Sequence, residues 1–151
     1  MNNNTSPSEK KLNSLVKYYQ AGHYDDAEIL AISIIKNYPN NQLSWKVLGA
    51  LLKKTGRLEE SLTSGRKAVL LSPADAEAHN NLAKTLMALG NLEEAEKSFK
   101  DALALEPNNA ELHNSMGNVV KELGRAEQAV ESFGKSISLN PTLVNPRYNL
   151  G

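Results

Sequence analysis

Residues 76–109, AEAHNNLAKTLMALGNLEEAEKSFKDALALEPNN, decide the fold of this chain. Apolar side chains recur three or four positions apart in the first half, at Leu82, Ala83 and Leu86, which is typical of a helix with one buried face. Gly90 interrupts the pattern, and a second helical stripe follows at Leu92, Ala95, Phe99 and Ala102. The segment is therefore predicted to form a hairpin of two helices.

The hairpin recurs along the chain, because proline stands 34 residues apart at Pro39, Pro73, Pro107 and Pro141. A period of about 20 to 50 residues indicates stacked copies of one supersecondary unit. Placing each proline at position 32 of a repeat gives four full repeats and a truncated fifth: 8–41, 42–75, 76–109, 110–143 and 144–151. Residues 1–7 are polar and are predicted to form a disordered tail, followed by one repeat domain over 8–151.

Equivalent positions carry the same residue types in successive repeats. Position 15 is always glycine, which suits a turn with positive φ, at Gly22, Gly56, Gly90 and Gly124. Position 20 is always small, at Ala27, Ser61, Ala95 and Ala129. First helices are predicted near 8–21, 41–55, 75–89, 109–123 and 143–151, with N-caps at Asn41, Asp75 and Asn109. Second helices are predicted near 24–37, 58–71, 92–105 and 126–139.

These positions resemble the tetratricopeptide repeat (TPR) family, whose pattern places Trp, Leu-Gly, Tyr, Ala, Phe and Pro at such spacings. Trp45 at position 4, Leu48-Gly49 at positions 7 and 8, and Phe99 at position 24 are examples. The resemblance implies an all-α fold, a right-handed α-solenoid in which first helices line a concave groove. Gly65 replaces phenylalanine at position 24 of repeat two, where looser packing is expected.

The composition excludes several classes of function. Seventeen basic residues balance 17 acidic residues, so no net field favours nucleic acid or a membrane surface. The chain has no cysteine, which excludes a disulfide framework and a thiolate metal site. No apolar run reaches the length of a signal peptide or a membrane span. We therefore expect a cytoplasmic protein without cofactors.

Catalysis by this chain is not expected. His79 and His113 occupy position 4, where Trp45 stands in repeat two, so both are interpreted as packing residues. No phosphate-binding loop, dinucleotide fingerprint, zinc-ligand helix or nucleophile elbow is present. Acidic and basic residues four apart, such as Glu96 with Lys100 and Glu131 with Lys135, are interpreted as a solvated outer face.

The candidate site is the groove, which would bind a protein or extended peptide. Residues expected to face it are Asn13, Lys46, Lys53, Lys54, Asn80, Asn81, Lys84, Asn114, Asn118, Lys121 and Asn149. The lysines cluster in repeats two and three, which favours an acidic segment; the alternative is that they only keep the face soluble. The lysine and asparagine set of chaperone-binding TPR clamps is absent, so that partner is disfavoured.

Asparagine is unfavourable inside helices, by up to about 0.7 kcal/mol relative to alanine, so its recurrence here needs a compensating interaction. A file of amides can hold an extended backbone by donating to C=O and accepting from N–H. Position 6 runs Asn13, Val47, Asn81, Ser115, Asn149 and resembles the asparagine ladder of O-linked N-acetylglucosamine transferase repeats. The alternative is that these amides bond to neighbouring helices or to water.

The fifth repeat stops at Gly151, which indicates a fragment of a longer protein. One alternative function is therefore the substrate-recruiting arm of a glycosyltransferase, sulfotransferase or methyltransferase. Another is an assembly scaffold that acts through its ends or convex face. End-to-end self-association is expected through an exposed apolar stripe formed by Val130, Phe133, Ile137, Val144 and Leu150.

Overall fold

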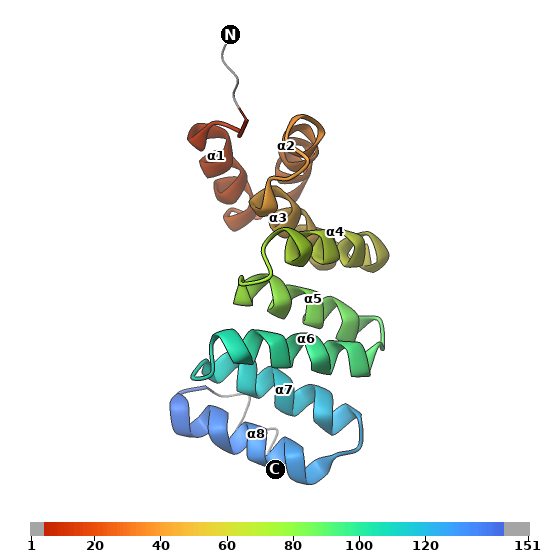
Figure 1. Cartoon of the computed structure of the whole chain (residues 1–151), viewed down its shortest axis with the longest axis vertical. Helices are drawn as coiled ribbons and strands as arrows, with labels where there is room; N and C mark the ends of the chain where they lie inside the picture. Colours follow the sequence, from red (N-terminus) through yellow and green to blue (C-terminus); the bar gives the residue numbers. More distant parts are fainter. Residues whose placement is uncertain (1–4, 144–151) are drawn as a thin grey trace. The chain divides into compact units, whose positions relative to one another are not determined.

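A computed structural model describes residues 5–143, and these residues form eight α-helices and no strand (Figure 1). The first helices of the four repeats are α1 (Glu9–Gln20), α3 (Gln42–Lys54), α5 (Ala76–Ala88) and α7 (Ala110–Glu122). The second helices are α2 (Tyr24–Asn37), α4 (Leu58–Leu71), α6 (Leu92–Leu105) and α8 (Ala126–Leu139). The second helices match the predicted ranges, and the first helices differ by one residue at each end. The helix predicted at 143–151 lies almost entirely outside the described residues.

The first helices begin at side-chain caps, as predicted. Asn41 Oδ1 accepts a hydrogen bond from Ser44 N at 3.0 Å, and Asp75 Oδ1 accepts one from Ala78 N at 3.2 Å. Asn109 makes the equivalent bond for α7. Each oxygen satisfies an N–H group that has no partner within its helix. The polar residue at the end of one repeat therefore starts the next hairpin.

Glycine closes each hairpin turn in the left-handed region that the sequence predicted. The φ angles are +77° at Gly22, +82° at Gly56, +80° at Gly90 and +81° at Gly124. The next residue then bonds back across the turn, as Arg57 N does to Leu52 O at 2.9 Å. This bond is typical of a Schellman motif. A side chain at position 15 would be strained there, which explains why all four full repeats carry glycine.

The described chain divides into two compact units, one ending at Pro73 and the other beginning at Ala74. In the first unit, α1 packs on α2 and α3, α2 packs on α3, and α3 packs on α4. In the second unit, each helix from α5 to α8 packs on the next. The largest fully buried side chains are Phe99, Phe133, Leu15, Ile34, Leu51, Leu86, Leu112 and Val119. The all-α class is confirmed, and within each unit the hairpins stack as in a helical solenoid.

The proline carbonyl at position 32 accepts a hydrogen bond from position 4 of the next repeat. Trp45 Nε1 donates to Pro39 O at 2.7 Å, and His113 Nε2 lies 2.8 Å from Pro107 O. Histidine thus performs at position 4 the role that tryptophan performs in repeat two. The interpretation of His113 as a structural residue agrees with this contact.

The prediction of an exposed apolar stripe on α8 is wrong for one residue, Phe133. Phe133 is fully buried, because its ring packs where Gly117 of α7 has no side chain. Val130 is 56% exposed and Ile137 is half-buried. Val144 and Leu150 lie outside the described residues. Residues 1–7 were predicted to form a disordered tail, but Pro7, the last of them, is buried.

Candidate functional site

Three of the predicted groove residues meet in one pocket of the second unit. Asn80, Asn81 and Lys84 occupy positions 5, 6 and 9 of α5, a spacing that places them on one face of the helix. Glu111, at position 2 of α7, forms part of the opposite wall. The pocket has a volume of about 300 Å³. It therefore lies between the first helices of two successive repeats.

The charge of this pocket differs from the expected positive groove. Lys84 Nζ lies 2.9 Å from Glu111 Oε1, so the two charges neutralise each other. Glu77 and Glu106 line the same pocket, which thus contains three carboxylates and one lysine. Glu106 Oε2 also accepts a hydrogen bond from Asn109 Nδ2 at 2.8 Å. The lining therefore contains more acidic than basic side chains.

Two asparagines at position 5 have side-chain oxygens that no donor satisfies. The Oδ1 atoms of Asn80 and Asn114 are both shielded from solvent, and neither has a hydrogen-bond partner among the described residues. Asn114 as a whole is only 8% exposed. A buried acceptor without a partner costs about 1 to 3 kcal/mol. The same unsatisfied group therefore recurs at equivalent positions of α5 and α7.

The other predicted groove residues are distributed over both units. Asn118 and Lys121 lie on α7, half-buried and exposed respectively. The first unit holds Asn13 on α1 and three lysines on α3: Lys46, Lys53 and Lys54. Asn149 lies outside the described residues. Asn80, Asn81 and Lys84 are thus the predicted groove residues that line the α5–α7 pocket.

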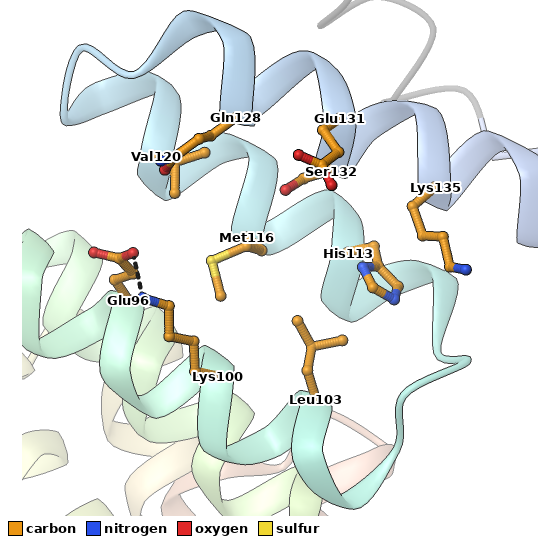
Figure 2. Close-up of a pocket in the computed structure, with 10 residues that line it drawn as sticks. All are labelled: Glu96, Lys100, Leu103, His113, Met116, Val120, Gln128, Glu131, Ser132 and Lys135. Carbon is orange, nitrogen blue, oxygen red and sulfur yellow. Dashed lines mark ion pairs between the residues drawn. The ribbon is translucent and has the colours of Figure 1, made fainter.

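A second and larger pocket lies between the two second helices of the same unit, α6 and α8 (Figure 2). Its volume is about 680 Å³. Leu103, Met116 and Val120 provide its apolar lining. The charged side chains that were predicted to form a solvated face surround it: Glu96, Lys100, Glu131 and Lys135.

Glu96 is the most strongly constrained charge of this second pocket. It is buried, and its Oε1 lies 2.7 Å from Lys100 Nζ and 2.8 Å from Arg125 Nη1. The hydrogen bond from Lys100 lowers the pKa of the Glu96 carboxyl; burial opposes this effect, and the bond from Arg125 lowers the pKa further. The pair with Lys100 was predicted.

The bond from Arg125 was missed, although a periodic signal for it exists in the sequence. Arg125 stands at position 16 and Glu96 at position 21 of the preceding repeat, and the same positions in repeats two and one are Arg57 and Glu28. Arg57 Nη1 lies 2.6 Å from Glu28 Oε1. The two ion pairs each link successive repeats inside one unit. Pairing position 16 with position 21 of the previous repeat predicts both.

Two further properties concern only residues 5–143. No group of three or more histidine, cysteine, aspartate or glutamate side chains in this range is arranged to hold a metal ion. None of the helices there is both long and apolar enough to span a bilayer.

Family models for the tetratricopeptide repeat match three segments of the chain. Two models described as tetratricopeptide repeats match residues 76–109 and 110–143, and a model described as a TPR repeat matches residues 49–90. Together they run from residue 49 to residue 143, which is more than half of the chain. Two of the matches coincide with the third and fourth repeats defined by the proline period.

Solved structures share the fold. A crystal structure of MamA aligns with 25% identity and a TM-score of 0.83, covering 89% of this chain and 78% of MamA. The MamA MSR-1 structure has 26% identity, a TM-score of 0.76, and coverage of 87% and 75%. Pseudomonas aeruginosa pilF, at 20% identity and a TM-score of 0.85, covers 94% of this chain and 65% of its own. No curated protein matches the chain. The family models and the repeat geometry together show that the chain belongs to the tetratricopeptide repeat family.

Proposed function

We propose that this protein binds an extended polypeptide segment along the inner face of α5 and α7. Tetratricopeptide repeat proteins are protein-interaction modules, so the family supports a polypeptide as the class of partner. The pocket around Asn80, Asn81 and Lys84 supports this face as the place of binding. Asn118 and Lys121, which follow on α7, are the next predicted contacts.

The unsatisfied oxygens of Asn80 and Asn114 are the observation that carries the proposal. An extended backbone offers N–H donors and C=O acceptors, and a side-chain amide can satisfy both. Because both Oδ1 atoms are shielded from water in the free protein, we expect each amide to rotate about χ2 when the peptide binds. The oxygen then accepts a peptide N–H, and the free-energy cost of the unpaired acceptor is recovered on binding.

The pocket favours a neutral or basic segment over an acidic one. Three carboxylates and one lysine line it, and Lys84 is already paired with Glu111. The prediction of an acidic partner depends on the lysines of repeats two and three, of which Lys46, Lys53 and Lys54 belong to the other unit. The amide contacts address the peptide backbone, so we expect weak selection among uncharged side chains. The likeness of position 6 to a glycosyltransferase asparagine ladder remains a prediction.

A random dodecapeptide library displayed on phage tests the proposal. We expect selection on the intact protein to enrich peptides that lack net negative charge. The affinity of a synthetic enriched peptide is then measured by calorimetry against Asn80→Ala and Asn114→Ala variants. We expect each variant to weaken binding about tenfold, which corresponds to about 1.4 kcal/mol.

The matched control is Asn108→Ala, because Asn108 is exposed in the loop before α7. It should leave the affinity unchanged. Enriched peptides that bind both position-5 variants as tightly as the intact protein would contradict binding at this face. They would favour the alternative of a scaffold that acts through its ends or its convex face.

A further inference from the structure

The groove between α6 and α8 shows how a second helix covers the hairpin that follows it (Figure 2). One wall comes from the hairpin of repeat four, at repeat positions 4, 7 and 11 on α7 and at repeat positions 19, 22, 23 and 26 on α8. These residues are His113, Met116, Val120, Gln128, Glu131, Ser132 and Lys135. The preceding second helix, α6, contributes positions 21, 25 and 28: Glu96, Lys100 and Leu103. These repeat positions define the two walls of an inter-repeat groove.

Repeat one has the wall that its own hairpin forms, but among the described residues it lacks the wall that a preceding second helix would form. A pocket of about 580 Å³ is lined by positions 4, 7 and 11 of α1 and by positions 19, 22, 23 and 26 of α2. These residues are Lys11, Ser14, Tyr18, Asp26, Ile29, Leu30 and Ser33, and Ser8 and Lys10 complete the lining. α1 is the first helix of the described range, so no second helix precedes it there. We call this surface the α1–α2 slot.

The slot carries apolar side chains at two positions where the groove of repeat four is polar or charged, although Lys10, Lys11 and Asp26 also line it. Position 22 is Ile29 in the slot and Glu131 in repeat four, and position 23 is Leu30 instead of serine. Ile29 is 69% exposed. Ile29 and Tyr18, which line the same pocket, therefore leave apolar area in contact with water.

α8 presents the residues that complete such a groove. Its positions 21, 25 and 28 are Val130, Gly134 and Ile137, where α6 has glutamate, lysine and leucine. Val130 is 56% exposed, and a β-carbon placed on Gly134 would meet no atom within 4 Å. Among the described residues, α8 therefore presents an apolar surface at these three positions.

We propose that α8 of one molecule docks in the α1–α2 slot of a second molecule, in the register by which α6 covers repeat four. Charged residues face charged residues between α6 and α8, and apolar residues would face apolar residues between α8 and the slot. The contact joins two different surfaces, so it is heterologous, and repeated contacts build either closed rings or open head-to-tail chains. This inference does not depend on peptide binding by α5 and α7.

Two charge substitutions separate the two surfaces. Ile29→Glu disables the slot but leaves α8 intact, and Val130→Glu disables α8 but leaves the slot intact. Both side chains are more than half exposed, so neither substitution disturbs the core. Leu70→Glu is the matched control, because Leu70 is 73% exposed on α4 and belongs to neither surface.

Sedimentation velocity over a hundredfold concentration range measures the assembly. We expect the average mass of the unmodified protein and of Leu70→Glu to rise with concentration above that of the monomer. Ile29→Glu and Val130→Glu alone should remain monomeric. An equimolar mixture of these two variants should form a dimer and nothing larger, because it contains one working slot and one working α8 per pair.

Three results would overturn the inference. The first is an unmodified protein that stays monomeric throughout the range. The second is assembly by either charge variant alone. The third is a variant mixture that remains monomeric while the unmodified protein assembles, since that would indicate a symmetric contact between identical surfaces. Circular dichroism of each variant confirms that its helices are retained.

Discussion

Phe133 of α8 fills the space that Gly117 of α7 leaves empty. A β-carbon placed on Gly117 would lie 2.5 Å from Phe133 Cδ1 and closer still to Cε1. Such separations do not occur between unbonded carbons, so the glycine and the fully buried ring are complementary. The two residues fix how closely the helices of repeat four approach each other.

Gly117→Ala should therefore destabilise the protein even though alanine is the better helix former. The added methyl group must displace the Phe133 ring, and such overpacking costs about 1 to 3 kcal/mol. The gain in helix propensity is about 1 kcal/mol at most. We expect a net decrease in the free energy of unfolding, measured as a lower urea midpoint.

Gly134→Ala is the internal control for this substitution. Gly134 lies in the same hairpin on α8, and nothing stands within 4 Å of the β-carbon it would gain. Only the propensity gain applies, so the urea midpoint should rise. Equal effects of the two substitutions would show that Phe133 moves aside freely.

Glu96 should make part of the stability depend on pH. Its folded-state pKa is lowered, chiefly by the hydrogen bond from Lys100. A lowered pKa gives stability that is fully present above the pKa of the unfolded chain, about 4.3 for glutamate, and is lost as the pH falls through the folded-state value. We expect Glu96→Gln to cost about 1 to 2 kcal/mol at pH 7 and progressively less below about pH 4. Urea unfolding of both proteins between pH 3 and pH 7 measures the difference.

The control for this prediction is Glu93→Gln, an exposed carboxylate in the first turn of the same helix. A cost of Glu96→Gln that stays constant down to pH 3 would indicate that the carboxylate charge is not what stabilises the contact. Arg125→Gln should reproduce part of the effect, because Arg125 donates the second bond to Glu96.

Asn114 and Asn109 should respond to alanine with opposite signs. Asn109 caps α7 by accepting from Leu112 N at 3.2 Å, and loss of such a cap costs about 1 kcal/mol. Asn114 buries an oxygen without a donor, so removing it relieves an unfavourable term of similar size. We expect the melting temperature to fall for Asn109→Ala and to rise for Asn114→Ala. If Asn114→Ala also lowers the melting temperature, its amide is a structural contact and the proposed binding role loses its support.

The fold could be predicted from the sequence because the four full repeats carry the same residue types at equivalent positions. Pro107 alone is weak evidence, but four prolines in one register assign a helix position to every residue between them. Glycine at position 15 and polar caps such as Asn109 are local requirements of backbone geometry, and these predictions are confirmed. Local geometry is what a sequence pattern encodes most directly.

The site was less accessible, because it depends on which side chains meet across repeats. Lys84 was expected to make the groove positive, but Glu111 of the next repeat neutralises it. Phe133 was expected to belong to an exposed apolar stripe, but Gly117 provides a space for its ring inside its own hairpin. Both cases require pairing positions between helices, a step that periodicity within one helix does not supply.

The packing of repeat two gives the last prediction. Gly65 at position 24 predicted a loose second helix, but in the structure Gly49 of α3 lies close to it. A β-carbon on Gly49 would be 3.3 Å from Gly65 N and 3.5 Å from Ser61 O, and Ser61 Oγ donates to Gly49 O at 2.7 Å. Two glycines thus bring backbone atoms of α3 and α4 close together at the position where Phe99 and Phe133 stand in later repeats. We expect the central amides of α4 to exchange with deuterium no faster than those of α6. We also expect Gly49→Ala to lower the free energy of unfolding by about 1 kcal/mol or more, because the backbone atoms near the new methyl group cannot move aside as a side chain can. Faster exchange in α4 would restore the prediction of loose packing.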